Sequence, residues 1–150
     1  MAVTPDGKQA VSASDDQTLK VWDLASGREL RTLAGHSSFV SAVTVAPDGK
    51  QAVSASWDNT LKVWDLASGR ETRTLTGHTE WVNALAVTPD GKHAASACRD
   101  HTLKVWDLAT GTAVATFTCD APTACCVFAG DRKIVAGDAS GRVHFLALEF

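Results

Sequence analysis

The stretch QAVSASWDNTLKVWDLASG, residues 51–69, decides the fold of this chain, because nearly the same residues return at 9–27 and 93–111. The three copies place Trp22, Trp64 and Trp106 at a constant spacing of 42 residues. A fixed period of about 20 to 50 residues indicates a repeat architecture, in which each unit stacks on its neighbours. We therefore predict a row of similar units.

The composition is that of a globular protein with a buried core. The chain has 150 residues, of which 45% are hydrophobic and 21% charged, and its formal net charge is −3. Basic residues are spread along the chain, so no surface for nucleic acid or anionic membranes is expected. No apolar run reaches the roughly 18 residues that a membrane-spanning helix needs. We expect a cytoplasmic protein with no nucleic-acid or membrane partner.

The four cysteines, Cys98, Cys119, Cys125 and Cys126, match no zinc or disulfide spacing. Neighbouring residues of a strand point to opposite faces, so Cys125 and Cys126 cannot easily converge on one ion. The sequence also lacks a glycine-rich phosphate loop. We expect no metal site and no cofactor.

Each unit is predicted to hold four short strands joined by tight turns. Residues 5–8, 47–50 and 89–92 all read Pro-Asp-Gly-Lys, a turn sequence because proline presets φ and glycine accepts a positive φ. Runs such as 11–14 and 19–22 contain small, β-branched and large apolar residues, which favours strands. The fold class is therefore all-β.

A single four-stranded sheet cannot bury both faces alone, and radial stacking of such sheets gives a β-propeller. We predict one partial propeller of about four blades, at residues 1–34, 38–76, 80–118 and 122–150, with the last blade lacking its outer strand. Such an arc leaves two apolar blade faces uncovered. Two completions stay open: a head-to-tail homodimer that forms an eight-bladed ring, or further blades upstream in a longer product.

The period and two recurring dipeptides resemble those of the WD-repeat family. Gly-His occurs at 35–36 and 77–78, and Trp-Asp occurs at 22–23, 64–65 and 106–107. The resemblance covers nearly the whole chain and implies a propeller fold. The last repeat, at residues 135–146, is similar to the closing segment of large bacterial WD-repeat proteins, including signalling NTPases.

The resemblance also implies a hydrogen-bonded set of histidine, serine, aspartate and tryptophan in each blade. In this sequence the sets are His36, Ser54, Asp58 and Trp64; His78, Ser96, Asp100 and Trp106; and an incomplete set of Ser12, Asp16 and Trp22. The same residue types occur in hydrolase triads, but here they recur with every repeat, whereas an active site needs one nucleophile facing a cavity. We therefore predict no catalytic residues and no enzyme activity.

Differences between the repeats mark one side of the propeller. Residues 1–36 and 43–78 differ at only seven positions. With the strands of a blade named a to d from the inside outwards, variation gathers in the loops between b and c and between d and a, which emerge on the same side. The residues predicted to bind a partner are Phe39, Trp57, Trp81, Asp15, Arg99, Ser41 and Asn83.

Aromatic residues and arginine are the usual anchors of protein interfaces. Similar positions commonly contact partners in the WD-repeat family. We therefore predict a non-enzymatic scaffold or sensor that binds a protein or peptide through this loop face. Two alternatives stay open. The aromatic rings could instead cover neighbouring blades. The chain could be a structural half-propeller, or a C-terminal part of a larger bacterial signalling protein, that binds only after ring completion.

Overall fold

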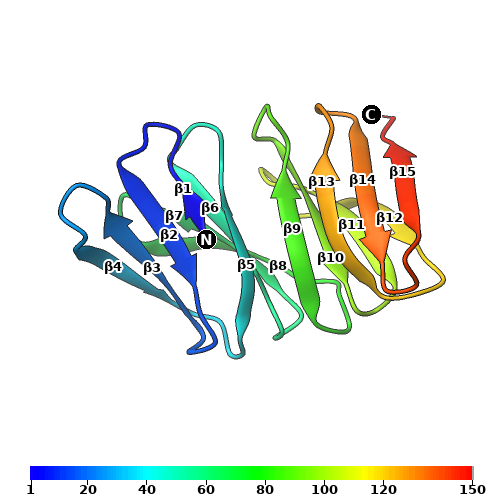
Figure 1. Ribbon diagram of the computed structural model, residues 1–150, viewed down its shortest axis with the longest axis horizontal. Coiled ribbons are helices and arrows are strands. Elements are labelled where there is room, and N and C mark those ends of the chain that lie inside the picture. The colour runs from blue at the N-terminus through cyan, green and yellow to red at the C-terminus, as the bar shows by residue number, and fades with distance from the viewer. Residues whose placement is uncertain (150) are drawn as a thin grey trace.

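The computed structural model describes residues 1–149, so Phe150, the end of the predicted fourth blade, lies outside the described residues. The chain forms four antiparallel sheets whose strand order follows the sequence (Figure 1). The strands are, in the first sheet, β1 (Ala2–Val3), β2 (Gln9–Ala13), β3 (Thr18–Asp23) and β4 (Glu29–Ala34); in the second, β5 (Val40–Val45), β6 (Gln51–Ser56), β7 (Leu61–Asp65) and β8 (Arg70–Leu75); in the third, β9 (Val82–Val87), β10 (His93–Cys98), β11 (Thr102–Asp107) and β12 (Ala113–Thr118); and in the fourth, β13 (Thr123–Phe128), β14 (Lys133–Asp138) and β15 (Val143–Ala147).

This arrangement confirms the predicted all-β fold of propeller blades. Every connection within a sheet is a hairpin between neighbouring strands. Between residues 1 and 149, no helix is long and apolar enough to cross a bilayer.

The Pro-Asp-Gly-Lys turns close the hairpins between the first two strands of three sheets. Gly49 adopts a φ of +70°, which a residue with a Cβ adopts only at a cost. Its N–H donates to the carbonyl of Ala46 at 2.9 Å. The Asp48 carboxylate accepts from the Lys50 N–H at 2.9 Å. Local chemistry therefore fixes the turn before any packing does.

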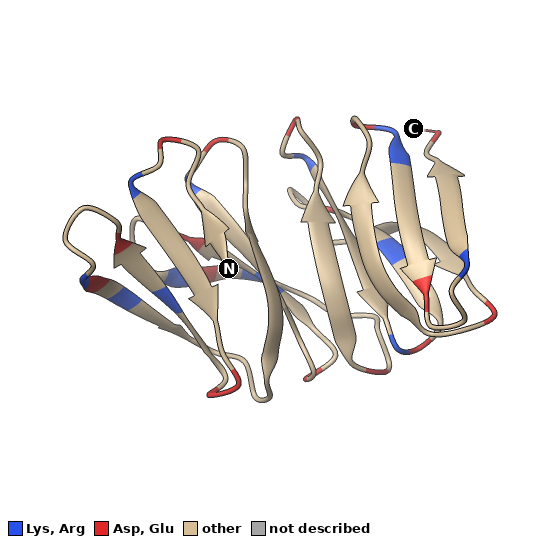
Figure 2. Ribbon diagram, in the orientation of Figure 1, with Lys and Arg blue, Asp and Glu red and all other residues tan. Residues whose placement is uncertain are grey.

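The first strand of each sheet lies at the inside of the arc. The inner strands β5, β9 and β13 run side by side in Figure 1. None of the three carries a charged residue, and Figure 2 shows charged residues mainly in loops and in the other strands. The charge pattern follows from the packing, because the inner strands contact neighbouring sheets along their length.

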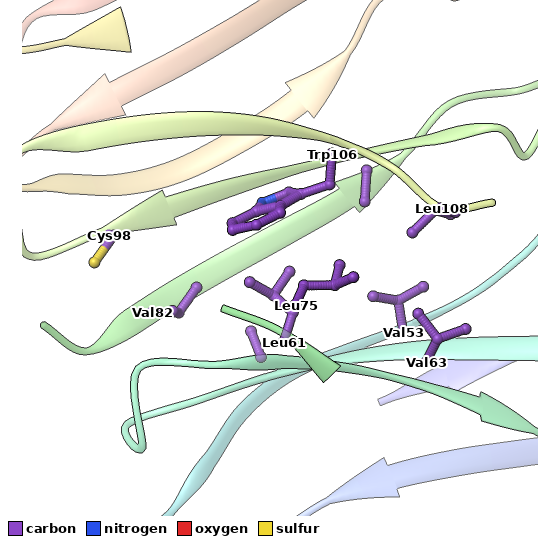
Figure 3. Packing of buried hydrophobic residues seen from close by; sticks show 10 residues of the cluster. Val53, Leu61, Val63, Leu75, Val82, Cys98, Trp106 and Leu108 are labelled. Carbon is purple, nitrogen blue, oxygen red and sulfur yellow. The ribbon is translucent and has the colours of Figure 1, made fainter. Parts of the chain in front are cut away.

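The core lies between the sheets. We call the side of a sheet that packs on the next sheet its trailing face, and the side that packs on the preceding sheet its leading face. Between the second and third sheets, Val53 and Val63 of the trailing face meet Trp106 and Leu108 of the leading face (Figure 3). The whole cluster comprises Val53, Ala55, Leu61, Val63, Leu75, Val82, Ala94, Cys98, Trp106 and Leu108.

The same packing joins the first sheet to the second. Val11, Leu19, Val21 and Leu33 of the first sheet share one buried cluster with Trp64 of the second. All five side chains are at most 1% exposed. Fully burying one such side chain contributes about 1.5–3 kcal/mol. The third and fourth sheets share a related cluster, in which Ile134 and Ala136 pack on Leu103 and Val105.

Candidate functional site

A chain of hydrogen bonds links the two central strands of the second sheet to His36, which precedes the sheet, and to Asp58 in the turn between those strands. Trp64 Nε1–H donates to Ser54 Oγ at 2.8 Å. Ser54 Oγ lies 2.8 Å from His36 Nε2, and His36 Nδ1 lies 2.7 Å from Asp58 Oδ2. Thr60 completes the Asp58 site by donating its N–H at 3.0 Å and its hydroxyl at 2.6 Å.

The proton on each atom of this chain follows from what each group can do. A carboxylate only accepts, so His36 must carry its proton on Nδ1. Ser54 Oγ accepts from the Trp64 indole and is left to donate its own proton to His36 Nε2. A neutral histidine therefore satisfies every partner. The donors then follow one another from Trp64 through Ser54 and His36 to the Asp58 carboxylate, which only accepts.

The third sheet repeats this chain. Trp106 Nε1 donates to Ser96 Oγ at 2.8 Å, Ser96 Oγ lies 2.7 Å from His78 Nε2, and His78 Nδ1 lies 2.8 Å from Asp100 Oδ2. Gly77 explains the Gly-His dipeptide: its φ is +146°, and an added Cβ would lie 3.4 Å from the Trp106 ring. A compact residue here lets the histidine reach inwards.

The first sheet holds only part of the chain. Trp22 Nε1 donates to Ser12 Oγ at 2.9 Å. Asp16 accepts the N–H and hydroxyl of Thr18, at 3.0 and 2.7 Å, and is exposed. Of the predicted structural residues, these three therefore form two separate contacts, and the other eight form two continuous chains.

Burial controls the ionisation of the chains. Burial lowers the pKa of His36 and of His78 below the ordinary value, although hydrogen bonds to Asp58 and Asp100 oppose the effect. Burial alone would raise the pKa of Asp100, but hydrogen bonds from Thr102 and His78 outweigh it and lower the pKa to about 2. The favoured state is neutral histidine beside ionised aspartate.

A row of stacked side chains crosses the loop side of the second and third sheets. We call Phe39, Trp57, Trp81 and Arg99 the loop-face ridge. The ring centroids of Phe39 and Trp57 lie 5.2 Å apart. Those of Trp57 and Trp81 lie 4.1 Å apart with an angle of 3° between the planes. The Arg99 guanidinium carbon lies 4.8 Å from the Trp81 ring centre.

Backbone pairing explains why the loops between b and c and between d and a vary together. The Trp57 N–H donates to the Phe39 carbonyl, and the Arg99 N–H donates to the Trp81 carbonyl, both at 2.9 Å. Each pair therefore sets two side chains next to each other on one sheet. Trp57 stacking on Trp81 then joins the second sheet to the third, so the ridge is also an inter-sheet contact.

The ridge is accessible and has a hollow at one end. Phe39 is 40% exposed and Trp81 36% exposed. A depression of about 430 Å³ lies where the ridge meets the fourth sheet. It is lined by Trp57, Trp81, Asn83, Arg99, Pro122, Ala124 and Ala139. Asp15, the counterpart of Trp57 in the first sheet, is exposed.

The remaining two predicted partner-binding residues lie between sheets. Ser41 Oγ donates to the Val82 carbonyl at 2.5 Å, and Asn83 Nδ2 donates to the Thr123 carbonyl at 3.0 Å. Both stand at an irregularity in the pairing of the inner strand, where the side chain is turned from the usual alternation. In the structure their polar groups are engaged by the next sheet.

The repeats also match a known family. The model of the WD domain, G-beta repeat, covers residues 1–23, 27–65 and 69–107, which is more than half of the chain. The chain belongs to the WD-repeat family. WD repeats generally mediate protein–protein interaction, and the family is generally non-enzymatic.

Three relatives show the extent of the similarity. Autophagy-related protein 16 of Arabidopsis thaliana is 49% identical over 45 residues, 30% of this chain and 9% of that protein. Dynein assembly factor with WD repeat domains 1 of Xenopus laevis is 46% identical over 43 residues, 29% of this chain and 10% of that protein. The probable serine/threonine-protein kinase PkwA of Thermomonospora curvata is 45% identical over 42 residues, 28% and 6% of the two chains. The matched segments thus span a tenth or less of these relatives.

The two hydrogen-bond chains connect the same residue types as a hydrolase triad, but their serines are not accessible to a substrate. Ser54 and Ser96 are both 0% exposed, and each already accepts an indole N–H. A nucleophile must reach a substrate carbonyl with donors for the oxyanion. These serines can reach neither, so the two chains serve the fold.

One group of metal-ligand type occurs in the third WD repeat. Atoms of His78, Cys98 and Asp100 lie within 4.8 Å of one another. Burial raises the pKa of Cys98 to about 12, which disfavours the thiolate that a metal would need. Both His78 nitrogens already have hydrogen-bond partners. We therefore assign His78 and Asp100 to the hydrogen-bond chain of this repeat, and the Cys98 sulfur to its own hydrogen bonds with the Glu80 carbonyl and the Asp100 N–H.

The fourth sheet lies beyond the match to the family model and has a different fastening. Asp138 accepts the N–H and hydroxyl of Ser140, at 2.9 and 2.6 Å, and lies 2.8 Å from His144 Nε2. These hydrogen bonds, Ser140 first and then His144, lower the pKa of Asp138. Sequence reasoning missed this set because its members stand at other offsets; the Asp-Ala-Ser turn before the last strand was the available signal.

Proposed function

We propose that this chain is a non-enzymatic scaffold or sensor module that binds a protein or peptide partner along the loop-face ridge. The observation that carries the proposal is the stack of Phe39, Trp57, Trp81 and Arg99, in which Trp57 is half-buried and the other three are exposed. Aromatic residues and arginine dominate binding energy where they fill or flank a hollow, and the depression beside Arg99 offers one.

Two charged residues, Asp15 of the first sheet and Arg99 at one end of the ridge, suggest the character of the partner. Asp15 is exposed at the first sheet and Arg99 at the third, with aromatic rings between them. A complementary segment would be extended, with a basic residue near the first sheet, apolar or aromatic residues in the middle and an acidic residue near the third. Asp15 is therefore part of the proposed site, whereas Ser41 and Asn83 support it from between the sheets.

Arg99→Glu is the sharpest probe of this site. Trp57→Ala would also remove stacking between two sheets, at a cost of about 0.5–1.5 kcal/mol for each aromatic pair lost. Arg99 is exposed and contacts one ring, so reversing its charge changes recognition with little change in stability.

The test is a selection of displayed random peptides on the wild-type chain. Enriched peptides should pair an acidic residue with an apolar or aromatic one, and should bind Arg99→Glu at least tenfold more weakly. Lys92→Glu is the matched control, because Lys92 lies in the turn on the opposite side of the propeller. Peptides that bind both variants equally would place the site elsewhere.

A second candidate is a structural role. The trailing face of the fourth sheet carries exposed apolar side chains, including Phe145. The chain would then bind a partner only after its ring is completed, by a second copy or by further blades of a larger bacterial signalling protein. Peptide affinity measured against chain concentration separates the two roles: binding that appears only together with a doubled mass favours the structural one.

A further inference from the structure

The trailing faces of the four sheets are built alike but covered unequally. Val63 of the second sheet is 2% exposed and Val105 of the third is 0% exposed, because the next sheet packs on each. Phe145 occupies the same register position of the fourth sheet, opposite Val135, and is 79% exposed. Val143, two residues away on the same face, is 57% exposed. The fourth sheet therefore carries an uncovered face of a kind that is buried elsewhere in the molecule.

The leading face of the first sheet is the matching surface. Leu66 and Leu108, at the ends of the leading faces of the second and third sheets, are 5% and 8% exposed, whereas Leu24 is 48% exposed at the equivalent place. Trp22 is likewise less buried than Trp64 or Trp106. The first two repeats are nearly identical in sequence, so this face already has the shape that packs on a trailing face.

We propose that two copies of this chain associate head to tail, with the trailing face of the fourth sheet of one copy packed on the leading face of the first sheet of the other. The contact repeats the one that joins consecutive sheets within the chain. Two such contacts, related by a twofold axis, close a ring of eight sheets. The proposal does not depend on the loop-face ridge.

A hollow on the fourth sheet shows how the contact would interlock. Figure 3 shows Leu108 lying over Val53 and Val63 of the preceding sheet. The equivalents of those valines, Val135 and Phe145, line a depression of about 400 Å³. Leu24 of the second copy is the side chain that would enter it.

The polar groups at the edge of the leading face are already prepared for burial. Lys20 Nζ pairs with Glu29 at 2.7 Å, as Lys62 pairs with Glu71 at 2.8 Å. The Lys62 side chain is only 11% exposed under the first sheet, whereas that of Lys20 is 34% exposed. Covering the first sheet would therefore bury an ion pair that already exists and would leave no unpaired charge in the contact.

The mass in solution tests the contact directly. Wild-type chain at micromolar concentration should have twice the 15.8 kDa mass of one chain by light scattering. Phe145→Glu and Leu24→Lys should each have the mass of one chain, because each places a charge against an apolar surface in both contacts. Leu30→Lys is the matched control. Leu30 is also 48% exposed, but it lies on β4, and the equivalent residue of the second sheet is the polar Thr72, so no apolar contact is expected there. A wild-type mass of one chain, or a Phe145→Glu variant that stays paired, would overturn the proposal.

Mixing the two variants tests the head-to-tail geometry. A pair of one Phe145→Glu copy and one Leu24→Lys copy has one native contact and one contact where glutamate faces lysine. The mixture should therefore regain the mass of two chains, while each variant alone does not. Association of fourth sheet with fourth sheet, or of first sheet with first sheet, predicts no such rescue. A mixture whose mass stays that of one chain would therefore reject the proposed geometry. Unchanged circular dichroism of each variant shows that it is folded.

Cys125 provides a second readout on the same face. It is exposed and pairs across the strands with Gly137, on the trailing side of the fourth sheet. Its alkylation by a maleimide should slow at least tenfold in the wild-type pair relative to the Phe145→Glu variant. Equal rates would mean that this face stays open and would contradict the proposal. Cys98 and Cys119 are buried and serve as slow internal references.

Discussion

The second and third sheets reach the same buried chemistry with the same residues, whereas the fourth reaches a related result with others. In the first two cases a tryptophan, a serine and a histidine lead to an aspartate in the turn between strands b and c. In the fourth sheet Asp138 stands at the end of β14 and takes Ser140 and His144 as donors. The three sheets share a carboxylate near that turn whose oxygens accept hydrogen bonds from neighbouring side chains and backbone N–H groups. The tryptophan is an addition that fills the space between sheets.

The largest effect expected from this comparison concerns that space. Trp106→Ala should lower the free energy of unfolding by about 3–5 kcal/mol, because it empties a buried site and removes the indole donor to Ser96. Leu146→Ala, at the same position of the fourth sheet, should cost about 1–2 kcal/mol, since this side chain is only partly buried. Urea denaturation measures both. Equal losses would show that the fourth sheet depends on its core as strongly as the third does.

A smaller effect should appear on lowering the pH. The pKa of His36 and of His78 is lowered in the folded state, so the unfolded chain binds protons more readily. Stability should therefore be lost as the pH falls from about 7.5 through the ordinary histidine pKa, near 6.5, to about 5. Asp138 has a lowered pKa as well, but its contribution is lost only below the ordinary aspartate value, near 3.9.

The histidine variants separate these two ranges. The double variant His36→Gln and His78→Gln should be less stable than the wild type at pH 7.5. Its free energy of unfolding should, however, fall much less than that of the wild type between pH 7.5 and 5. The free energy of unfolding at a series of pH values is the measurement. An unchanged slope in the double variant would move the origin of the decline to another group.

The smallest effect concerns one backbone position. Gln17, Asn59 and His101 all have positive φ, at 74°, 71° and 66°, and the fourth sheet has Gly141 there at 88°. Gln17→Gly should raise the stability by about 0.5–1 kcal/mol, because glycine adopts this conformation without strain. Asn59→Gly should gain less, since asparagine tolerates it better. A loss of stability in Gln17→Gly would mean that the glutamine side chain has a contact worth more than the strain.

The fold could be predicted because its signals are local and repeated. The period of the tryptophans set the sheets, and the turn residues set the hairpins. The members of the two complete hydrogen-bond chains also followed from the family resemblance. The position of the ridge followed from comparing repeats, since Trp57 and Trp81 stand where the copies differ.

Three features could not be predicted from the sequence, each for a physical reason. The sequence left open that the aromatic rings cover neighbouring blades, but it did not give the pairing of Trp57 with Trp81, because a comparison of single units contains no contact between units. The side chains of Ser41 and Asn83 point between the sheets because the strand pairing is irregular at these residues. The strict alternation of side chains along a strand therefore predicts the wrong face for them. Asp138 and His144 form their contact at a spacing that the other repeats do not use.

The hydrogen bonds from Ser41 to Val82 and from Asn83 to Thr123 run one way, from each sheet to the one made after it. A ribosome delivers the donor of each pair before its acceptor. Before the next sheet is made, Ser41 has only the Ala55 carbonyl of its own sheet, 3.1 Å away, and Asn83 lacks the Thr123 carbonyl. The side-chain hydrogen bond that joins two sheets can therefore form only after the later sheet has been made. The equivalent residue of the fourth sheet is Ala124, which has no donor to satisfy. At this position the fourth sheet therefore has no side-chain donor to offer to a neighbouring sheet.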